Sequence, residues 1–76
     1  MNLNKRNNMK NPNRLDNIYT TILQLHKTTM PDVRIGQLFI NFERWCKLVK
    51  NIHDIFYIED EEFLLYFKEY INDVTY

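Results

Sequence analysis

Cys46 and His53 are the only residues in the sequence that could serve as a Cys–His catalytic pair, because the chain has one cysteine and no serine. Such a pair needs an accessible thiol, an adjacent base and donors for an oxyanion. Cys46 lies among apolar residues at helical spacing, where a cysteine usually behaves as a small buried hydrophobe. We therefore predict no enzyme and no catalytic residue. The remaining enzymatic alternative is a subunit that completes an active site shared with another chain.

His26, His53 and Cys46 are also the side chains best suited to a transition metal. No two of them have the short spacing, as in HxxxH or CxxC, that lets one turn present two ligands. Gly36 is the only glycine, so a glycine-rich loop for phosphate groups is absent from the sequence. We expect no metal and no cofactor, with His26 at the edge of a buried helix face and His53 in contact with solvent.

A run of four carboxylates, from Glu59 to Glu62, is the strongest local charge feature. Paired catalytic carboxylates need a pocket that separates their pKa values, and a calcium loop needs alternating oxygens with a turn glycine. Neither pattern is present. Carboxylates at a helix N-terminus instead complement its partial positive charge, which is the interpretation we favour. The alternative is a surface for a basic partner.

Charge is segregated along the chain although the formal net charge is zero. Residues 1–50 carry nine Lys or Arg against three Asp or Glu, and residues 51–76 carry one against seven. This polarity predicts that the acidic end folds back onto the basic end. A partner of opposite charge is the alternative. One side of a helix could carry the cations Arg34, Arg44, Lys47 and Lys50 and bind nucleic acid. A sequence pI of about 6.7 argues against this alternative.

Helical periodicity dominates the rest of the sequence and predicts an all-α fold, a small three-helix domain over residues 11–76 with a flexible tail at 1–10. The first helix should begin at Asn11 or Asn13 and end before Pro31. The second should run from Asp32 or Val33 to about Lys50, with Asp32 as cap, and the third should open at Glu59 or Asp60. The apolar connection 51–58 should pack onto the core, with 55–58 as a weak strand alternative. The expected buried faces are Leu15, Ile18, Tyr19, Ile22, Leu25 and His26; Ile35, Leu38, Phe39, Phe42, Trp45, Cys46 and Val49; and Phe63, Leu64, Phe67, Tyr70, Ile71 and Val74.

Aromatic residues make up 14% of the chain, more than a three-helix core of this size easily encloses. Ile40, Leu65 and Tyr66 fall outside the three buried faces, which predicts apolar surface for another chain. We expect the partner to be another protein, which includes a second copy of this chain in a homodimer. Nucleic acid is the weaker alternative. The sequence has no leader and no apolar run of about 20 residues, so we expect no membrane association and a cytoplasmic protein of a bacterial host cell.

Two sequence blocks resemble a pattern in short uncharacterised proteins of bacteria and their phages. These proteins share a PD-x-R-x-GQL-x-x-N block, matched here by residues 31–41, and a D-x-FY-x-EDEE block, matched by residues 54–62. The similarity covers about Pro31 to Ile71 and implies an intact small domain of bacterial or phage origin, without an assigned activity.

The shared polar residues of the two blocks suggest two local arrangements. In the first, a structural clasp, Arg34 pairs with a carboxylate of the 59–62 run, Gln37 holds the connection and Gly36 admits residues 55–58. In the second, Arg34, Gln37 and Asn41 face outward together as a binding row. We expect a non-enzymatic protein-interaction module, such as a phage factor that inhibits or redirects a host machine. The candidate interaction residues are Arg34, Gln37, Asn41, Arg44, Glu59, Asp60, Glu61, Glu62 and Tyr66.

Overall fold

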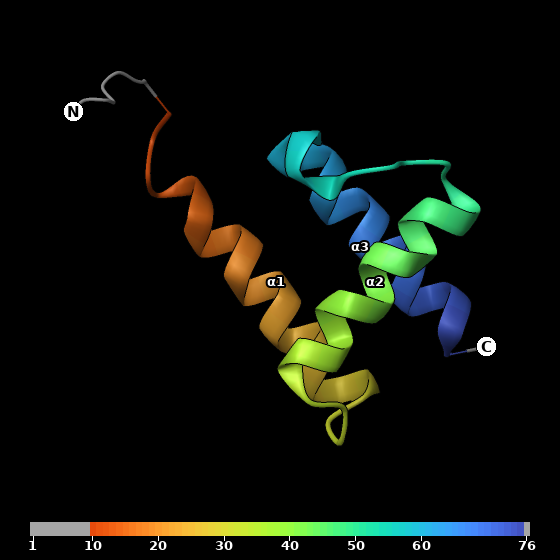
Figure 1. Cartoon of the computed structure of the whole chain (residues 1–76). Coiled ribbons are helices and arrows are strands. Elements are labelled where there is room, and N and C mark those ends of the chain that lie inside the picture. The colour runs from red at the N-terminus through yellow and green to blue at the C-terminus, as the bar shows by residue number, and fades with distance from the viewer. Residues whose placement is uncertain (1–9, 76) are drawn as a thin grey trace.

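Three α-helices and one 3-10 turn follow one another in residues 10–75, the part of the chain that this computed structural model describes (Figure 1). They are α1 (Arg14–Thr29), α2 (Ile35–Val49), η2 (Ile55–Tyr57) and α3 (Asp60–Val74). The prediction of a small all-α, three-helix domain is confirmed. Of the predicted tail, residues 1–9 lie outside the described residues, whereas Lys10 is described and its ammonium contacts Glu59.

The first helix ends where the sequence predicts, and a local turn precedes its start. The Asn11 side chain accepts a hydrogen bond from the Asn13 backbone N–H at 2.9 Å, just before the helix begins. At the other end, Thr28 donates its hydroxyl to the Gln24 carbonyl at 2.7 Å. Met30, which precedes Pro31, leaves the helical region with a φ of −151°.

The second helix begins later than predicted, at Ile35, and its cap is Arg34 instead of Asp32. The reason is a turn after α1, in which the Val33 N–H donates to the Met30 carbonyl at 3.1 Å. The Val33 carbonyl lies 2.6 Å from His26 Nε2, so this histidine ties the loop back to α1. The expectation that His26 lies at the edge of the buried face is therefore confirmed, and the side chain is partly buried.

Asn51 closes the last turn of α2. Its φ is 57°, and it is the one non-glycine residue with a positive φ among the described residues. Lys50 and Ile52 both donate backbone N–H groups to the Cys46 carbonyl, at 3.1 and 3.0 Å. Asparagine tolerates this left-handed conformation better than residues with bulkier side chains at Cβ. Asn51 thus turns the chain so that Ile52 packs against the core.

Asn51→Val should lower the free energy of unfolding by about 1–2 kcal/mol, because a β-branched side chain is strained at positive φ. Asn51→Gly should leave it unchanged or raise it slightly. Urea denaturation followed by circular dichroism measures both variants. Equal stability of the valine and glycine variants would contradict the left-handed turn.

The core forms where α3 packs against both α1 and α2. The chain runs along α1, returns along α2, crosses one end of the molecule and descends again along α3, so α1 and α3 begin at the same end (Figure 1). The described residues supply eight buried hydrophobic side chains, and α1 contributes only one of them. They are Ile22, Leu38, Phe42, Trp45, Cys46, Phe67, Tyr70 and Ile71.

Five residues predicted to be buried are exposed, for two physical reasons. Ile35, Val49 and Val74 are the first or last residues of their helices, where no neighbouring element covers them. On α1, the side chains that pack against the core are Ile18, Ile22 and Leu25, so the adjacent row is left in solvent. That row contains the other two exposed residues, Leu15 and Tyr19.

The connection between α2 and α3 packs only in part, which corrects the prediction for residues 51–58. Ile52 and Ile55 lie against the core, but Phe56 and Tyr57 are 80% and 77% exposed. The segment 55–57 is a 3-10 turn, not a strand. Ile55 and Ile58, on either side of the two aromatic rings, are partly buried, whereas the rings themselves point outward.

Candidate functional site

The predicted interaction residues fall into two separate groups. Arg34, Gln37, Asn41 and Arg44 are exposed along α2, whereas the acidic run lies at the start of α3. Glu59, Glu61 and Glu62 are exposed, and Asp60 is partly buried. The structure does not bring the two groups together.

The predicted clasp is wrong in each of its contacts. No ion pair joins Arg34 to any carboxylate of the described residues, and Asp60 and Glu59 have other partners. The Gln37 side chain accepts a hydrogen bond from the Arg34 N–H at 3.0 Å, so it caps its own helix instead of holding the connection. A Cβ on Gly36 would meet nothing within 4 Å, so this glycine admits no neighbouring segment.

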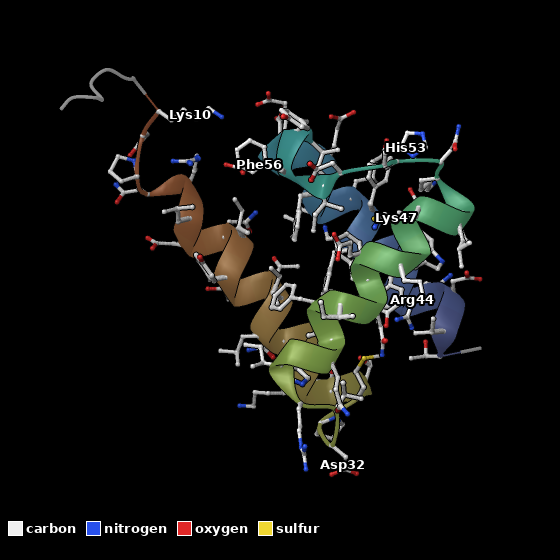
Figure 2. The ribbon with its side chains drawn as sticks, viewed as in Figure 1. Lys10, Asp32, Arg44, Lys47, His53 and Phe56 are labelled. Carbon is white, nitrogen blue, oxygen red and sulfur yellow. The ribbon has the colours of Figure 1, made fainter. Side chains whose placement is uncertain are left out.

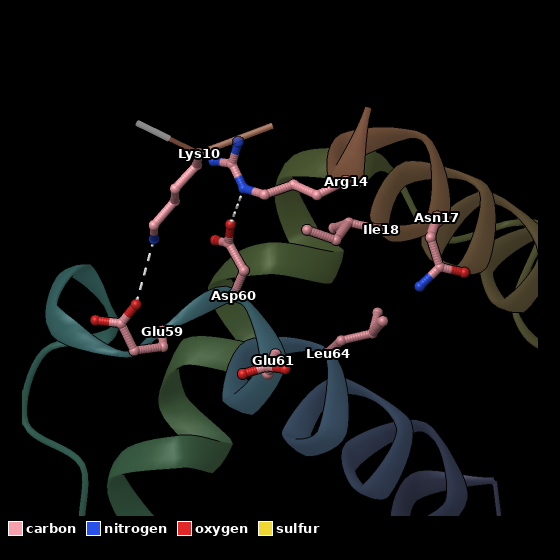
Figure 3. A pocket seen from close by; sticks show the side chains of 8 residues that line it. All are labelled: Lys10, Arg14, Asn17, Ile18, Glu59, Asp60, Glu61 and Leu64. Atoms are coloured by element: carbon pink, nitrogen blue, oxygen red, sulfur yellow. Dashed lines mark hydrogen bonds and ion pairs between the residues drawn. The ribbon is translucent and has the colours of Figure 1, made fainter. Parts of the chain in front are cut away.

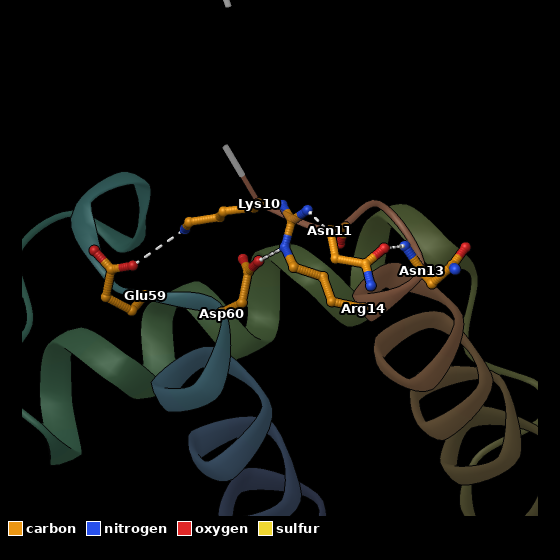
Figure 4. A network of polar contacts seen from close by, with 6 residues as sticks. All are labelled: Lys10, Asn11, Asn13, Arg14, Glu59 and Asp60. Carbon is orange, nitrogen blue, oxygen red and sulfur yellow. Dashed lines mark hydrogen bonds and ion pairs between the residues drawn. The ribbon is translucent and has the colours of Figure 1, made fainter. Parts of the chain in front are cut away.

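The acidic run instead meets the start of α1 (Figure 4). Lys10 Nζ lies 3.3 Å from a Glu59 carboxylate oxygen, and Arg14 Nε lies 2.7 Å from Asp60 Oδ2. Arg14 also donates to the Asn11 carbonyl, at 3.4 Å. The prediction that the acidic end folds onto the basic end is confirmed. Exposed pairs of this kind contribute about 0.2–1 kcal/mol each, so they orient the two helix starts more than they stabilise the fold.

A hollow of about 400 Å³ lies between the first turns of α1 and α3 (Figure 3). Ile18 and Leu64 form its apolar part, and both are partly buried against the core. Polar side chains complete the lining: Lys10, Arg14, Asn17, Glu59, Asp60 and Glu61. The hollow therefore combines an apolar floor with a rim that carries more negative than positive side chains.

Phe56 and Tyr57 present two aromatic rings beside this end of the molecule, with ring centroids 5.0 Å apart in an edge-to-face arrangement. The Asp54 side chain accepts a hydrogen bond from the Phe56 N–H at 2.9 Å, which fixes the turn. Figure 2 places Phe56 at the same end of the molecule as Lys10. The sequence analysis does not predict this pair, because it expects the whole connection, Phe56 included, to pack onto the core. The Asp54 turn signal before the two rings could have indicated otherwise.

Tyr66 is not free apolar surface, contrary to the prediction. It is partly buried against the core, and Lys50 Nζ lies 5.2 Å from its ring centroid. The same ammonium lies 5.9 Å from the Trp45 ring centroid and forms an ion pair with Glu69. Ile40 and Leu65, which share the predicted surplus, are 54% and 53% exposed as expected.

Cys46 is fully buried, and burial raises the pKa of its thiol. A raised pKa leaves less of the reactive thiolate at neutral pH. The prediction that Cys46 behaves as a buried hydrophobe is confirmed, and His53 is exposed, as expected. Within residues 10–75, no group of three or more His, Cys, Asp or Glu side chains is arranged to hold a metal ion.

Three groups should make the folded protein less stable in alkaline solution. Burial raises the pKa of Cys46 above 9.0 and that of Tyr70 above 10.0, and the hydrogen bond to Glu69 raises the pKa of Lys50 above 10.5. The folded state thus holds these protons more tightly than the unfolded state. Their stabilisation is complete below pH 9.0 and is lost as pH rises through the folded-state pKa values.

We therefore expect the free energy of unfolding to fall progressively above pH 9.0, as measured by urea denaturation at a series of pH values. Glu69→Gln should remove the part of this fall that Lys50 contributes above pH 10.5 and leave the earlier part. Stability that is constant up to pH 11, or that rises, would contradict the protonation scheme.

Comparison with protein-family models, with curated proteins and with solved structures gives no match to this chain. None of the helices within residues 10–75 combines the length and apolar character needed to cross a membrane.

Proposed function

We propose that this protein is a non-enzymatic helical module that binds another protein. The observation that carries the proposal is the balance of apolar side chains in residues 10–75: eleven large ones are exposed, whereas eight hydrophobic residues are buried. Single exposed apolar residues are normal, but grouped ones mark interaction surfaces. Here Leu15, Tyr19 and Leu23 recur every four residues along α1, and Phe56 and Tyr57 are in contact with each other.

The finer form of the proposal is a phage factor that inhibits or redirects a machine of its bacterial host. The resemblance of residues 31–41 and 54–62 to short bacterial and phage proteins supports this origin. A short chain with a buried thiol and no serine also suits a protein that acts by occupying a surface of its target. A homodimer formed through the same apolar side chains is the alternative partner arrangement.

The test places a photoreactive residue where the apolar side chains are most exposed. Tyr19→benzoylphenylalanine and Tyr57→benzoylphenylalanine keep an aromatic ring at positions 67% and 77% exposed. Asn72→benzoylphenylalanine, at an exposed polar position of α3, is the matched control. Irradiation in cells of the natural host, followed by mass spectrometry, should give one defined cross-linked protein from Tyr19 or Tyr57 and none from Asn72.

Light scattering of the purified protein separates the two partner arrangements. A cross-link to a second copy together with twice the monomer mass would identify a homodimer, and a cross-link to another chain would identify a foreign partner. A monomeric protein that cross-links to nothing from either aromatic position would refute the proposal.

Nucleic-acid binding is a second candidate, favoured by one observation. Arg34, Arg44 and Lys47 are exposed and have no ion-pair partner among the described residues, unlike Lys10, Arg14 and Lys50. Arg44 and Lys47 lie along the same stretch of α2 (Figure 2). If this candidate is correct, binding to duplex DNA should weaken as salt rises and disappear in Arg44→Ala/Lys47→Ala, but persist in Lys27→Ala.

A further inference from the structure

We infer that the end of the molecule where α1 and α3 begin is a docking site for a lysine- or arginine-rich segment of a partner protein. This inference rests on the proposed function and names the chemistry of the partner. The site consists of the hollow between α1 and α3 together with the exposed Phe56 and Tyr57, and we refer to it as the acidic–aromatic end.

The hollow has the shape and polarity of a site for a long cationic side chain. Lysine and arginine bury an aliphatic stem along apolar surface while their charged head remains among polar groups. Ile18 and Leu64 supply the apolar surface, and carboxylates of Glu59, Asp60 and Glu61 stand around it (Figure 3). A volume of about 400 Å³ is ample for one such side chain.

The charge of the rim selects a cation over an anion. Its two cations are already paired, Lys10 with Glu59 at 3.3 Å and Arg14 with Asp60 at 2.7 Å. Glu61 lines the hollow and Glu62 follows it, and neither has an ion-pair partner among the described residues. Among the described residues at this end, the four carboxylates of 59–62 therefore exceed the two cations, so a negatively charged partner such as nucleic acid is repelled and a basic segment is attracted.

The aromatic pair adds a second contact for the same partner. Phe56 and Tyr57 are 80% and 77% exposed, yet their backbone is held by the Asp54 side chain and by the Ile58 N–H, which donates to the Ile55 carbonyl at 3.3 Å. Rings presented on a fixed turn lose little conformational freedom on binding. Their faces attract guanidinium and ammonium groups, and aromatic side chains are enriched among the residues that dominate binding energy.

The direct test is fluorescence anisotropy of the full chain with a fluorescein-labelled eight-residue peptide that alternates arginine and glycine. Glu61→Gln/Glu62→Gln removes the unpaired charge, and Phe56→Ala removes one ring. Each variant should weaken peptide binding about tenfold, as expected when a residue that contributes strongly to the binding free energy is removed. Raising the salt concentration should weaken binding of the unmodified protein and change the glutamine variant less.

Two matched controls lie elsewhere on the surface. Asp32→Asn removes an exposed carboxylate at the opposite end of the molecule (Figure 2), and Leu48→Ala removes an apolar side chain 78% exposed. Both should bind the peptide as the unmodified protein does. Failure of the peptide to bind, or equal weakening by the control variants, would overturn the inference.

The outcome is separable from the proposed function. A defined protein cross-linked from Tyr19→benzoylphenylalanine, combined with no peptide binding at the acidic–aromatic end, would keep the interaction module and reject this site. Cross-linking from Tyr57→benzoylphenylalanine to a basic segment of the partner would support both. If no protein cross-links from either position, the proposed function fails, and this inference, which rests on it, is overturned with it.

Discussion

Phe42→Ala is expected to remove a large part of the free energy of unfolding of this protein. Phe42 is fully buried and its ring contacts four other aromatic rings, those of Trp45, Phe63, Phe67 and Tyr70, with centroids 5.0 to 6.4 Å apart. Truncation of a buried phenylalanine costs about 3–5 kcal/mol. At roughly 0.05–0.15 kcal/mol per residue, a chain of 76 residues has only about 4–11 kcal/mol to lose.

Urea denaturation followed by circular dichroism measures this loss, and Phe56→Ala provides its matched control. The same substitution at a side chain 80% exposed should change the free energy of unfolding by less than about 0.5 kcal/mol. A Phe42→Ala variant as stable as the unmodified protein would mean that the aromatic cluster is not the centre of the core. A large effect of Phe56→Ala would mean that the 3-10 turn is packed instead of exposed.

Ile22→Ala is expected to detach α1 from the other two helices. Ile22 is the only buried residue that α1 contributes, and α1 packs mainly against α3. Truncation of a buried isoleucine costs about 2–5 kcal/mol, and the loss falls on the contact between α1 and α3. The Phe42 cluster, by contrast, is built from α2 and α3 and retains all its rings.

Two probes read the two parts of the molecule separately. Hydrogen exchange of α1 amides should become faster in Ile22→Ala, as expected for local opening. Trp45, the only tryptophan, donates its indole N–H to Asp73 of α3 at 2.7 Å, so its fluorescence reports on the packing of α2 against α3. That signal should persist to higher urea than the protection of α1. Coincident transitions at an unchanged midpoint would contradict the separate role of Ile22.

The paired charges bear on the choice between the two candidate functions. Three basic side chains of the first fifty residues, Lys10, Arg14 and Lys50, form ion pairs with Glu59, Asp60 and Glu69. Of the four cations predicted to bind nucleic acid, only Lys50 is neutralised in this way within residues 10–75, so the pairing weakens the alternative function only in part. The same pairing leaves Glu61 and Glu62 without ion-pair partners among the described residues, which favours a basic partner at the acidic–aromatic end.

Helical periodicity was sufficient to predict the elements of the fold. The spacing of apolar residues placed the three helices correctly except for the start of α2, Pro31 marked the end of α1, and Glu59 and Asp60 marked the start of α3. These features are local, because helix formation and termination depend on residues within about a turn of one another. The burial of Cys46 followed from the same spacing.

Contacts between distant residues were decided only by the tertiary structure. The sequence indicated that acidic and basic halves would pair, but the partner of Asp60 is Arg14 and not Arg34, because α1 and α3 begin at the same end of the fold. The start of α2 was misplaced because His26, seven residues away, holds the Val33 carbonyl and the turn before the helix. The exposure of Phe56 is not predicted, because apolar character favours burial but does not show which side of a segment its neighbours cover. That choice depends on how the segment between α2 and α3 lies against the helices, and no short window of sequence contains it.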